Sequence, residues 1–84
     1  MPSYLVEAYV PRTHAGMLAE AVIRAREAAE RLTVEGRRIR FVRSTFVPSD
    51  ELCFLTFEAE SAAVVGEMAE RAEIEFERIV EAFE

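Results

Sequence analysis

RIRFVRSTFVPSDELCFLTFE, residues 38–58, is the segment that decides the fold. Its two arms, 38–47 and 52–58, are rich in aromatic and β-branched residues, which favour strands. The four residues between them, Pro48 to Glu51, suit a hairpin loop built on a type I turn. The segment therefore predicts two neighbouring antiparallel strands in the middle of the chain.

The simplest register of this hairpin places Val47 opposite Leu52, and then Phe46 opposite Cys53 and Val42 opposite Phe57. Because side chains alternate between the two faces of a strand, this register fixes which residues share a face. Cys53, Leu55 and Phe57 form an apolar row that we expect to lie beneath helices. Phe41, Arg43, Thr45, Phe54 and Thr56 are then expected on the other face.

The rest of the chain supplies two helices and two more strands. The remaining elements are predicted to be a strand over 4–10, a helix capped by Thr13 that reaches about Leu32, a helix capped by Ser61 that reaches about Ala72, and a last strand over 76–83. The first helix is expected to carry one apolar stripe, made of Leu18, Val22, Ala25, Ala29 and Leu32. Gly36 is expected to end the first helix. A helix is the alternative for 76–83, because Glu and Ala are good helix formers.

The predicted order is βαββαβ, which is the ferredoxin-like α+β fold. It has a four-stranded antiparallel sheet with two helices on one face, and the first and third strands lie in the middle. At 84 residues the chain has room for one domain, residues 1–84.

Composition limits the classes of function. The net charge is −6, and this acidic balance disfavours nucleic acid as a partner. The exception is the run from Arg37 to Arg43, which suits either an edge strand protected against pairing or a nucleic-acid contact. No apolar run is long enough to span a membrane and no secretory signal precedes the first strand, so a cytoplasmic protein without a membrane partner is expected.

The uncovered face of the predicted sheet is too apolar for water and too polar for a plain core. Its predicted members are Leu5, Glu7, Tyr9, Phe41, Arg43, Thr45, Leu52, Phe54 and Thr56, joined by Ile79, Glu81 and Phe83. A second sheet packed against this face would bury the aromatic side chains. We therefore expect an isologous homodimer of the dimeric α+β barrel type, in which the uncovered faces meet.

Polar side chains on this face form the candidate ligand-binding site. Glu7 and Arg43 are expected to approach each other, with aromatic walls around them. The predicted ligand-binding residues are Glu7, Tyr9, Arg43, Thr45, Phe54 and Thr56. Glu81 is expected to belong to the same polar cluster. The alternative is that Glu7 and Arg43 form a structural salt bridge at the dimer interface.

Two further residues carry reactive or metal-binding groups. Cys53 is the only cysteine, which excludes an internal disulfide and a metal site made of cysteines alone. Its predicted place beneath the helices favours a packing role over a nucleophilic one. His14 is the only histidine and is a weak candidate metal ligand, which would need a second copy and carboxylates to complete a site.

Four segments of the chain carry a family resemblance: YLVEAYVP, RSTFVPSDELCF, FEAESAAVV and FERIVEA. Through these segments, the chain resembles a family of small bacterial ferredoxin-like proteins that includes a homodimeric nickel-binding protein. The resemblance implies the same fold, a homodimer and the binding of a small ligand or metal. Nickel-binding relatives carry histidines on the first strand, on the second strand and near the second helix. Here those places hold Glu7, Ala8 and Tyr9, then Val42 and Arg43, then Met68 and Arg71.

Three classes of function remain open from the sequence. The first is a homodimeric protein that binds a small ligand or a divalent metal such as nickel, without a catalytic centre. The second is a cofactor-free isomerase or monooxygenase, in which Glu7 or Glu81 acts as a base and Arg43 holds an anionic substrate. The third is a structural or regulatory partner protein, with a closed interface and no cavity.

Overall fold

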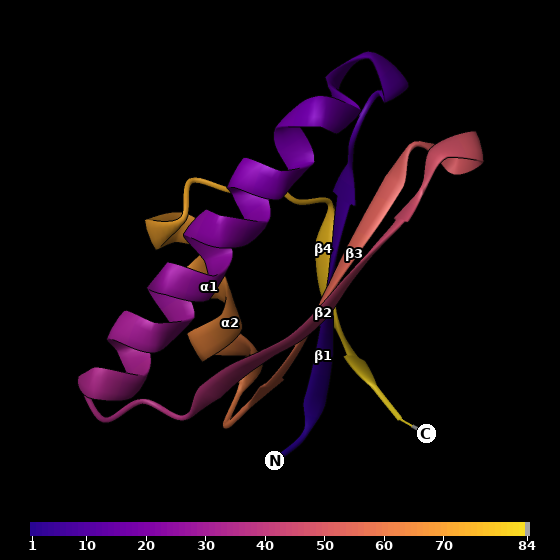
Figure 1. Ribbon diagram of the computed structural model, residues 1–84. Helices are drawn as coiled ribbons and strands as arrows, with labels where there is room; N and C mark the ends of the chain where they lie inside the picture. Colours follow the sequence, from indigo (N-terminus) through magenta and orange to yellow (C-terminus); the bar gives the residue numbers. More distant parts are fainter. Residues whose placement is uncertain (84) are drawn as a thin grey trace.

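The computed structural model of the protein describes residues 1–83 and has the predicted βαββαβ order. Its elements are β1 (Ser3–Tyr9), η1 (Arg12–Met17), α1 (Leu18–Val34), β2 (Ile39–Val47), η2 (Pro48–Asp50), β3 (Leu52–Ala59), α2 (Ala62–Arg71) and β4 (Arg78–Ala82), where η marks a short 3-10 helix. The antiparallel strands lie in the order β2-β3-β1-β4, with β1 and β3 in the middle. Both helices lie on one side of the sheet (Figure 1). This arrangement confirms the ferredoxin-like fold.

The hydrophobic core lies between the two helices and one face of the sheet. Val6 of β1 and Phe57 of β3 are fully buried there. α1 contributes Leu32 and a row of alanines, and α2 contributes Val64, Val65 and Met68. The small alanines let α1 approach the sheet closely, so the predicted apolar stripe of this helix is confirmed.

The first helix begins differently from the prediction. Thr13 does not cap it, because residues 12–17 form the 3-10 helix η1 and α1 begins at Leu18. The predicted end is confirmed. Gly36 has φ +93°, its N–H donates to the carbonyl of Thr33, and the N–H of Arg37 donates to the carbonyl of Leu32. These bonds form a Schellman motif, in which glycine takes the left-handed position.

The second helix begins where Ser61 caps it, as predicted. The Ser61 side chain accepts a hydrogen bond of 3.3 Å from the backbone N–H of Val64. The helix ends in a second Schellman motif, in which the N–H of Ile74 donates to the carbonyl of Ala69. Here the left-handed position is held by Glu73, with φ 55°.

The hairpin register is confirmed from Val47 to Arg43 and wrong beyond it. Val47 pairs with Leu52 and Arg43 pairs with Thr56, but a bulge at Val42 shifts the following pairs by one residue. Phe41 therefore pairs with Phe57 and lies on the helix side, rather than on the uncovered face. Its ring makes an edge-to-face contact with Phe57 at 5.5 Å between centroids.

The last strand is confirmed as a strand, so the helical alternative is wrong. β4 spans only 78–82, and its pairing gives the opposite alternation from the prediction. Ile79 pairs with Val6 and packs against the core, while Glu81 pairs with Tyr4, also on the helix side. Residue 83 follows the end of the strand. The uncovered face of β4 instead carries Arg78, Val80 and Ala82.

Candidate ligand-binding face of the sheet

The uncovered face of the sheet is organised in rows of side chains that run across the strands. One row is Arg43, Thr56, Leu5 and Val80, and the next is Thr45, Phe54, Glu7 and Arg78. A third row contains Val47, Leu52 and Tyr9. In Figure 1 this face is the side of the sheet turned away from α1 and α2, and none of the helices drawn from residues 1–83 covers it.

This face is apolar although no element of the described chain covers it. Leu5, Leu52, Phe54 and Val80 are all partly exposed, and the neighbouring Tyr9 is 55% exposed. Thr56, at the centre of its row, is only 9% exposed, because its neighbours on β1 and β2 surround it. An apolar surface with a few polar groups is typical of an interface or of the wall of a ligand site.

The charged side chains on this face are paired, with one exception. Nε of Arg78 donates to Oε2 of Glu7 at 2.7 Å, and the Glu7 side chain is only 17% exposed. Nε of Arg40 donates to Oε1 of Glu58 at 3.0 Å, which holds the pKa of Glu58 below its ordinary value. Among the residues that the structure describes, Arg43 has no hydrogen-bond acceptor and no carboxylate within salt-bridge distance.

Tyr9 stands at one end of the face and is held by the hairpin loop. Its hydroxyl donates to Oε1 of Glu51 at 3.2 Å, and the charge of that carboxylate raises the pKa of Tyr9. Glu51 also accepts a hydrogen bond of 2.8 Å from the backbone N–H of Arg12. One carboxylate thus joins the loop after β2 to the start of η1, which keeps this end of the face in place.

The structure brings the six predicted ligand-binding residues to one face but arranges their charges differently. Glu7 and Arg43 lie on β1 and β2 with β3 between them, in neighbouring rows, and the partner of Glu7 is Arg78. Arg78 was not identified from the sequence as a residue of this site. A signal was present, because Glu7 on β1 needs a basic neighbour and Arg78 is the only basic residue of the last strand. The expected position of Glu81 in the cluster is wrong, since it lies on the helix side.

The two reactive side chains lie away from this face. Cys53 is 1% exposed and faces the helices, and burial raises the pKa of its thiol. A buried thiol with a raised pKa is a poor nucleophile, so its packing role agrees with the prediction. His14 is exposed on η1. In the described part of the chain no three His, Cys, Asp or Glu side chains are grouped so that they could hold a metal ion.

Comparison with known proteins supports the fold. No protein-family model and no curated protein matches the chain. The structure is similar to the crystal structure of SCO4226 from Streptomyces coelicolor A3(2), with a TM-score of 0.73 over 95% of this chain and 94% of the other. The two sequences are 18% identical, so the likeness is one of fold. Among residues 1–83 there is no helix that is both long and apolar enough to cross a membrane.

Proposed function

We propose that the protein is a homodimeric binding protein that holds a small organic anion between the uncovered faces of two sheets. Arg43 is the residue that binds the anionic group in this proposal. Thr45 and Thr56 supply hydroxyl groups beside it, and Phe54 and Leu5 supply apolar walls. The family resemblance noted for the sequence suggests the same kind of dimer.

The observation that carries this proposal is the unequal pairing of charges on one apolar face. Glu7 is neutralised by Arg78 and Glu58 by Arg40, which leaves Arg43 as the unmatched cation of the face among the described residues. A guanidinium presents five N–H donors in a planar fork that fits a carboxylate or a phosphate. Burial of this cation between two sheets is costly unless an anion accompanies it.

Binding is favoured over catalysis because the proposed base is already engaged. Oε2 of Glu7 accepts a hydrogen bond from Arg78 at 2.7 Å, so this oxygen is engaged and not free to abstract a proton from a ligand. Glu81, the other candidate base, lies on the opposite face of the sheet. The carboxylates found on this face among residues 1–83, Glu7 and Glu58, are both paired with an arginine, which favours binding over catalysis by a free base.

The test compares ligand-induced thermal shifts of the wild-type protein and of Arg43→Met. Benzoate, salicylate and inorganic phosphate are the anionic probes, and nickel chloride is included because of the family resemblance. We expect at least one anion, at a hundred times its dissociation constant, to stabilise the wild-type protein by about 2.7 kcal/mol and raise its Tm by several degrees. The shift with inorganic phosphate, which has no apolar body, should disappear in Arg43→Met, and the shift with benzoate or salicylate should become smaller.

Arg12→Met is the matched control, because it removes an exposed arginine from η1 without touching the sheet face. It should keep the full anion-induced shift. If none of the anions stabilises the wild-type protein, or if Arg43→Met responds like the wild type, Arg43 does not bind an anion. If Arg43→Met dissociates the dimer in the absence of ligand, Arg43 is an interface residue instead. A shift with nickel alone would favour a metal-binding protein.

A further inference from the structure

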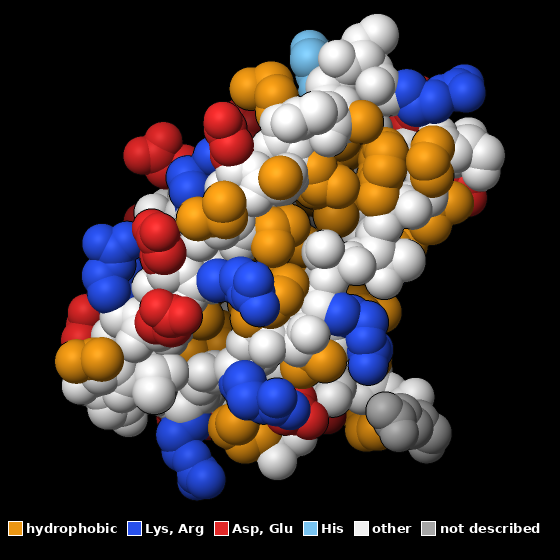
Figure 2. Space-filling view, in the orientation of Figure 1, with side chains coloured by type: hydrophobic (Ala, Val, Ile, Leu, Met, Phe, Trp, Pro, Cys, Tyr) orange, Lys and Arg blue, Asp and Glu red, His pale blue; other side chains and the backbone are white. Residues whose placement is uncertain are grey.

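A second region of the molecule has the features of a binding site and lies on the other side of the sheet. It is a groove of about 750 Å³ between the second half of α1 and the first residues of β2. Its apolar lining includes Ala29, Ile39 and Phe41, and Arg26, Arg37, Arg38 and Arg40 line it as well. Figure 2 shows several arginine side chains gathered on this face, over α1 and β2 in the lower half of the view.

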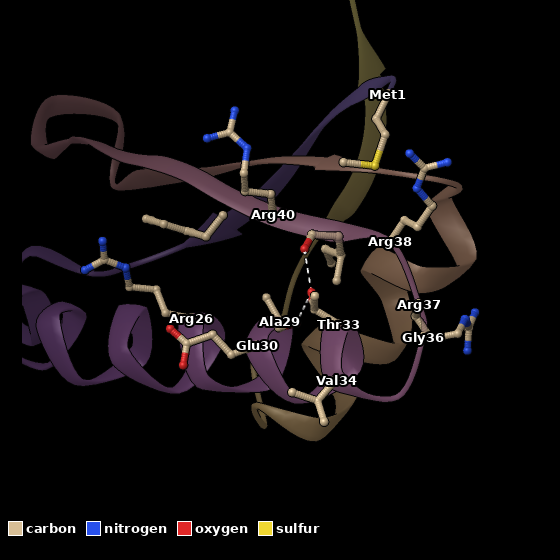
Figure 3. A pocket seen from close by; sticks show the side chains of 12 residues that line it. Met1, Arg26, Ala29, Glu30, Thr33, Val34, Gly36, Arg37, Arg38 and Arg40 are labelled. Atoms are coloured by element: carbon tan, nitrogen blue, oxygen red, sulfur yellow. Dashed lines mark hydrogen bonds between the residues drawn. The ribbon is translucent and has the colours of Figure 1, made fainter.

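Four of the ten arginines of an acidic chain line this groove, but they are not equivalent. Arg37 is held by Glu60 and Glu67, and Arg40 is held by Glu58 and points to the side of β2 away from α1 (Figure 3). Arg26 and Arg38 have no carboxylate partner for their side chains among residues 1–83. Figure 3 places these two toward opposite ends of the groove.

Arg26 is already positioned for an anion. Its guanidinium carbon lies 5.1 Å from the centroid of the Phe41 ring, an arrangement in which the cation is attracted to the face of the ring. The Arg26 guanidinium makes no hydrogen bond to an acceptor among residues 1–83, so its N–H donors are available to a ligand. A cation held over an aromatic ring at the rim of an apolar groove suits a ligand with a flat apolar body and one anionic group.

At the first residue of β2, the carbonyl oxygen that faces the groove already has a hydrogen-bond partner. The Thr33 hydroxyl lies 3.0 Å from the carbonyl oxygens of both Ala29 and Ile39 and shares its one hydrogen between them (Figure 3). An added strand would need the Ile39 carbonyl as an acceptor. The groove therefore fits a small molecule better than an extended peptide.

We infer that the groove between α1 and β2 is a second binding site, which takes an aromatic carboxylate. The aromatic body lies against Phe41 and Ile39, and the carboxylate binds Arg26. Glu30 follows Arg26 by one helical turn and its carboxylate also borders the groove, where it opposes an anion. The affinity for the carboxylate therefore depends on its attraction to Arg26 and its repulsion by Glu30. This site does not depend on the function proposed for the uncovered face.

The test is a titration of the ¹⁵N-labelled protein with 2-naphthoate, followed by NMR. Backbone amides of residues 26–34 and 37–41 should shift and saturate. Arg26→Gln should weaken binding by about tenfold or more, as expected for the loss of a hydrogen bond to a charged group. Glu30→Gln should strengthen it several-fold. The neutral analogue 2-naphthylmethanol should bind less tightly and should respond to neither substitution.

Arg43→Met separates this site from the uncovered face and should leave the affinity for 2-naphthoate in the groove unchanged. The inference is overturned if no amide of the groove shifts at millimolar 2-naphthoate, or if Arg26→Gln and the wild type bind equally well. Shifts confined to amides of the uncovered face, abolished by Arg43→Met, would also overturn it and would support the proposed function instead.

Discussion

Two residues hold the same backbone position at the ends of the two helices, but only one of them is glycine. Gly36 follows α1 with φ +93°, and Glu73 follows α2 with φ 55°. Both lie in a Schellman motif that closes the last turn. A residue with a Cβ atom is strained in this left-handed conformation by roughly 1–2 kcal/mol, so Glu73 stores strain that Gly36 does not.

Glu73→Gly should therefore stabilise the protein. We expect the free energy of unfolding to rise by about 1 kcal/mol, because the relief of strain exceeds the extra chain entropy that glycine gives to the unfolded state. Urea unfolding followed by circular dichroism measures this change. Gly36→Ala is the matched reciprocal change and should lower the stability by a similar amount. An unchanged or lower stability for Glu73→Gly would show that the left-handed conformation is not strained here.

At the scale of elements, hydrophobic spacing predicts the type and order of the strands and helices correctly. The stripe of α1, the Ser61 cap and the hairpin loop are each local signals, because they depend on neighbouring residues. Two features depend on residues far apart in the chain and were not predicted. The bulge at Val42 has no glycine or proline to mark it, and the alternation of β4 is set by its pairing with β1.

The two helices are tied together at their ends by an ion pair. Arg71 near the end of α2 donates two hydrogen bonds to Glu35 at the end of α1, at 2.7 and 2.8 Å. The Arg71 hydrogen bonds lower the pKa of Glu35 below its ordinary value of 4.5. A carboxylate whose pKa is lowered on folding stabilises the folded state above that ordinary value, and this contribution is lost as the pH falls through the folded-state pKa.

Glu35→Gln should therefore flatten the dependence of stability on pH below about pH 5. Both side chains of the pair are exposed, so the effect should be small and should weaken in salt. Urea titrations at several pH values between 3 and 7 give the slope. Arg71→Gln should flatten the same part of the curve, and the double variant should add little to either single change. Identical slopes in the wild type and Glu35→Gln would mean that this pair does not contribute to the acid sensitivity.

At the scale of the whole molecule, the sequence placed the six predicted ligand-binding residues on one face, but it misplaced Glu81 and did not predict which charges pair. Alternation along β1, β2 and β3 is enough to gather Glu7, Arg43, Thr45 and Phe54 on one side. Glu7 pairs with Arg78 because the two residues lie opposite each other on β1 and β4. The sequence shows that side chains alternate along β4, but not which residue of β4 lies opposite Glu7. The unmatched charge of Arg43, which carries the proposed function, therefore became visible only in the folded chain.

The proposed function requires that two copies meet through the uncovered face, and this is the most direct prediction for the whole molecule. Sedimentation velocity at micromolar concentration should show a dimer. Phe54→Glu places a carboxylate in the middle of the apolar face and should produce a monomer that keeps its secondary structure, because the side chain is outside the helix-side core. Val80→Glu, on β4 of the same face, should have the same effect.

Ile23→Glu is the matched control for these two variants. It puts the same charge on α1, where Ile23 is 53% exposed and outside the proposed interface, and it should leave the dimer intact. A wild-type monomer at micromolar concentration would contradict a dimer of this kind. If Ile23→Glu dissociates the dimer while Phe54→Glu does not, the copies meet through the helices, and the apolar character of the sheet face would then need another partner. Because Val80 lies on β4 and is not one of the proposed ligand-binding residues, Val80→Glu also tests whether ligand binding at Arg43 depends on the dimer.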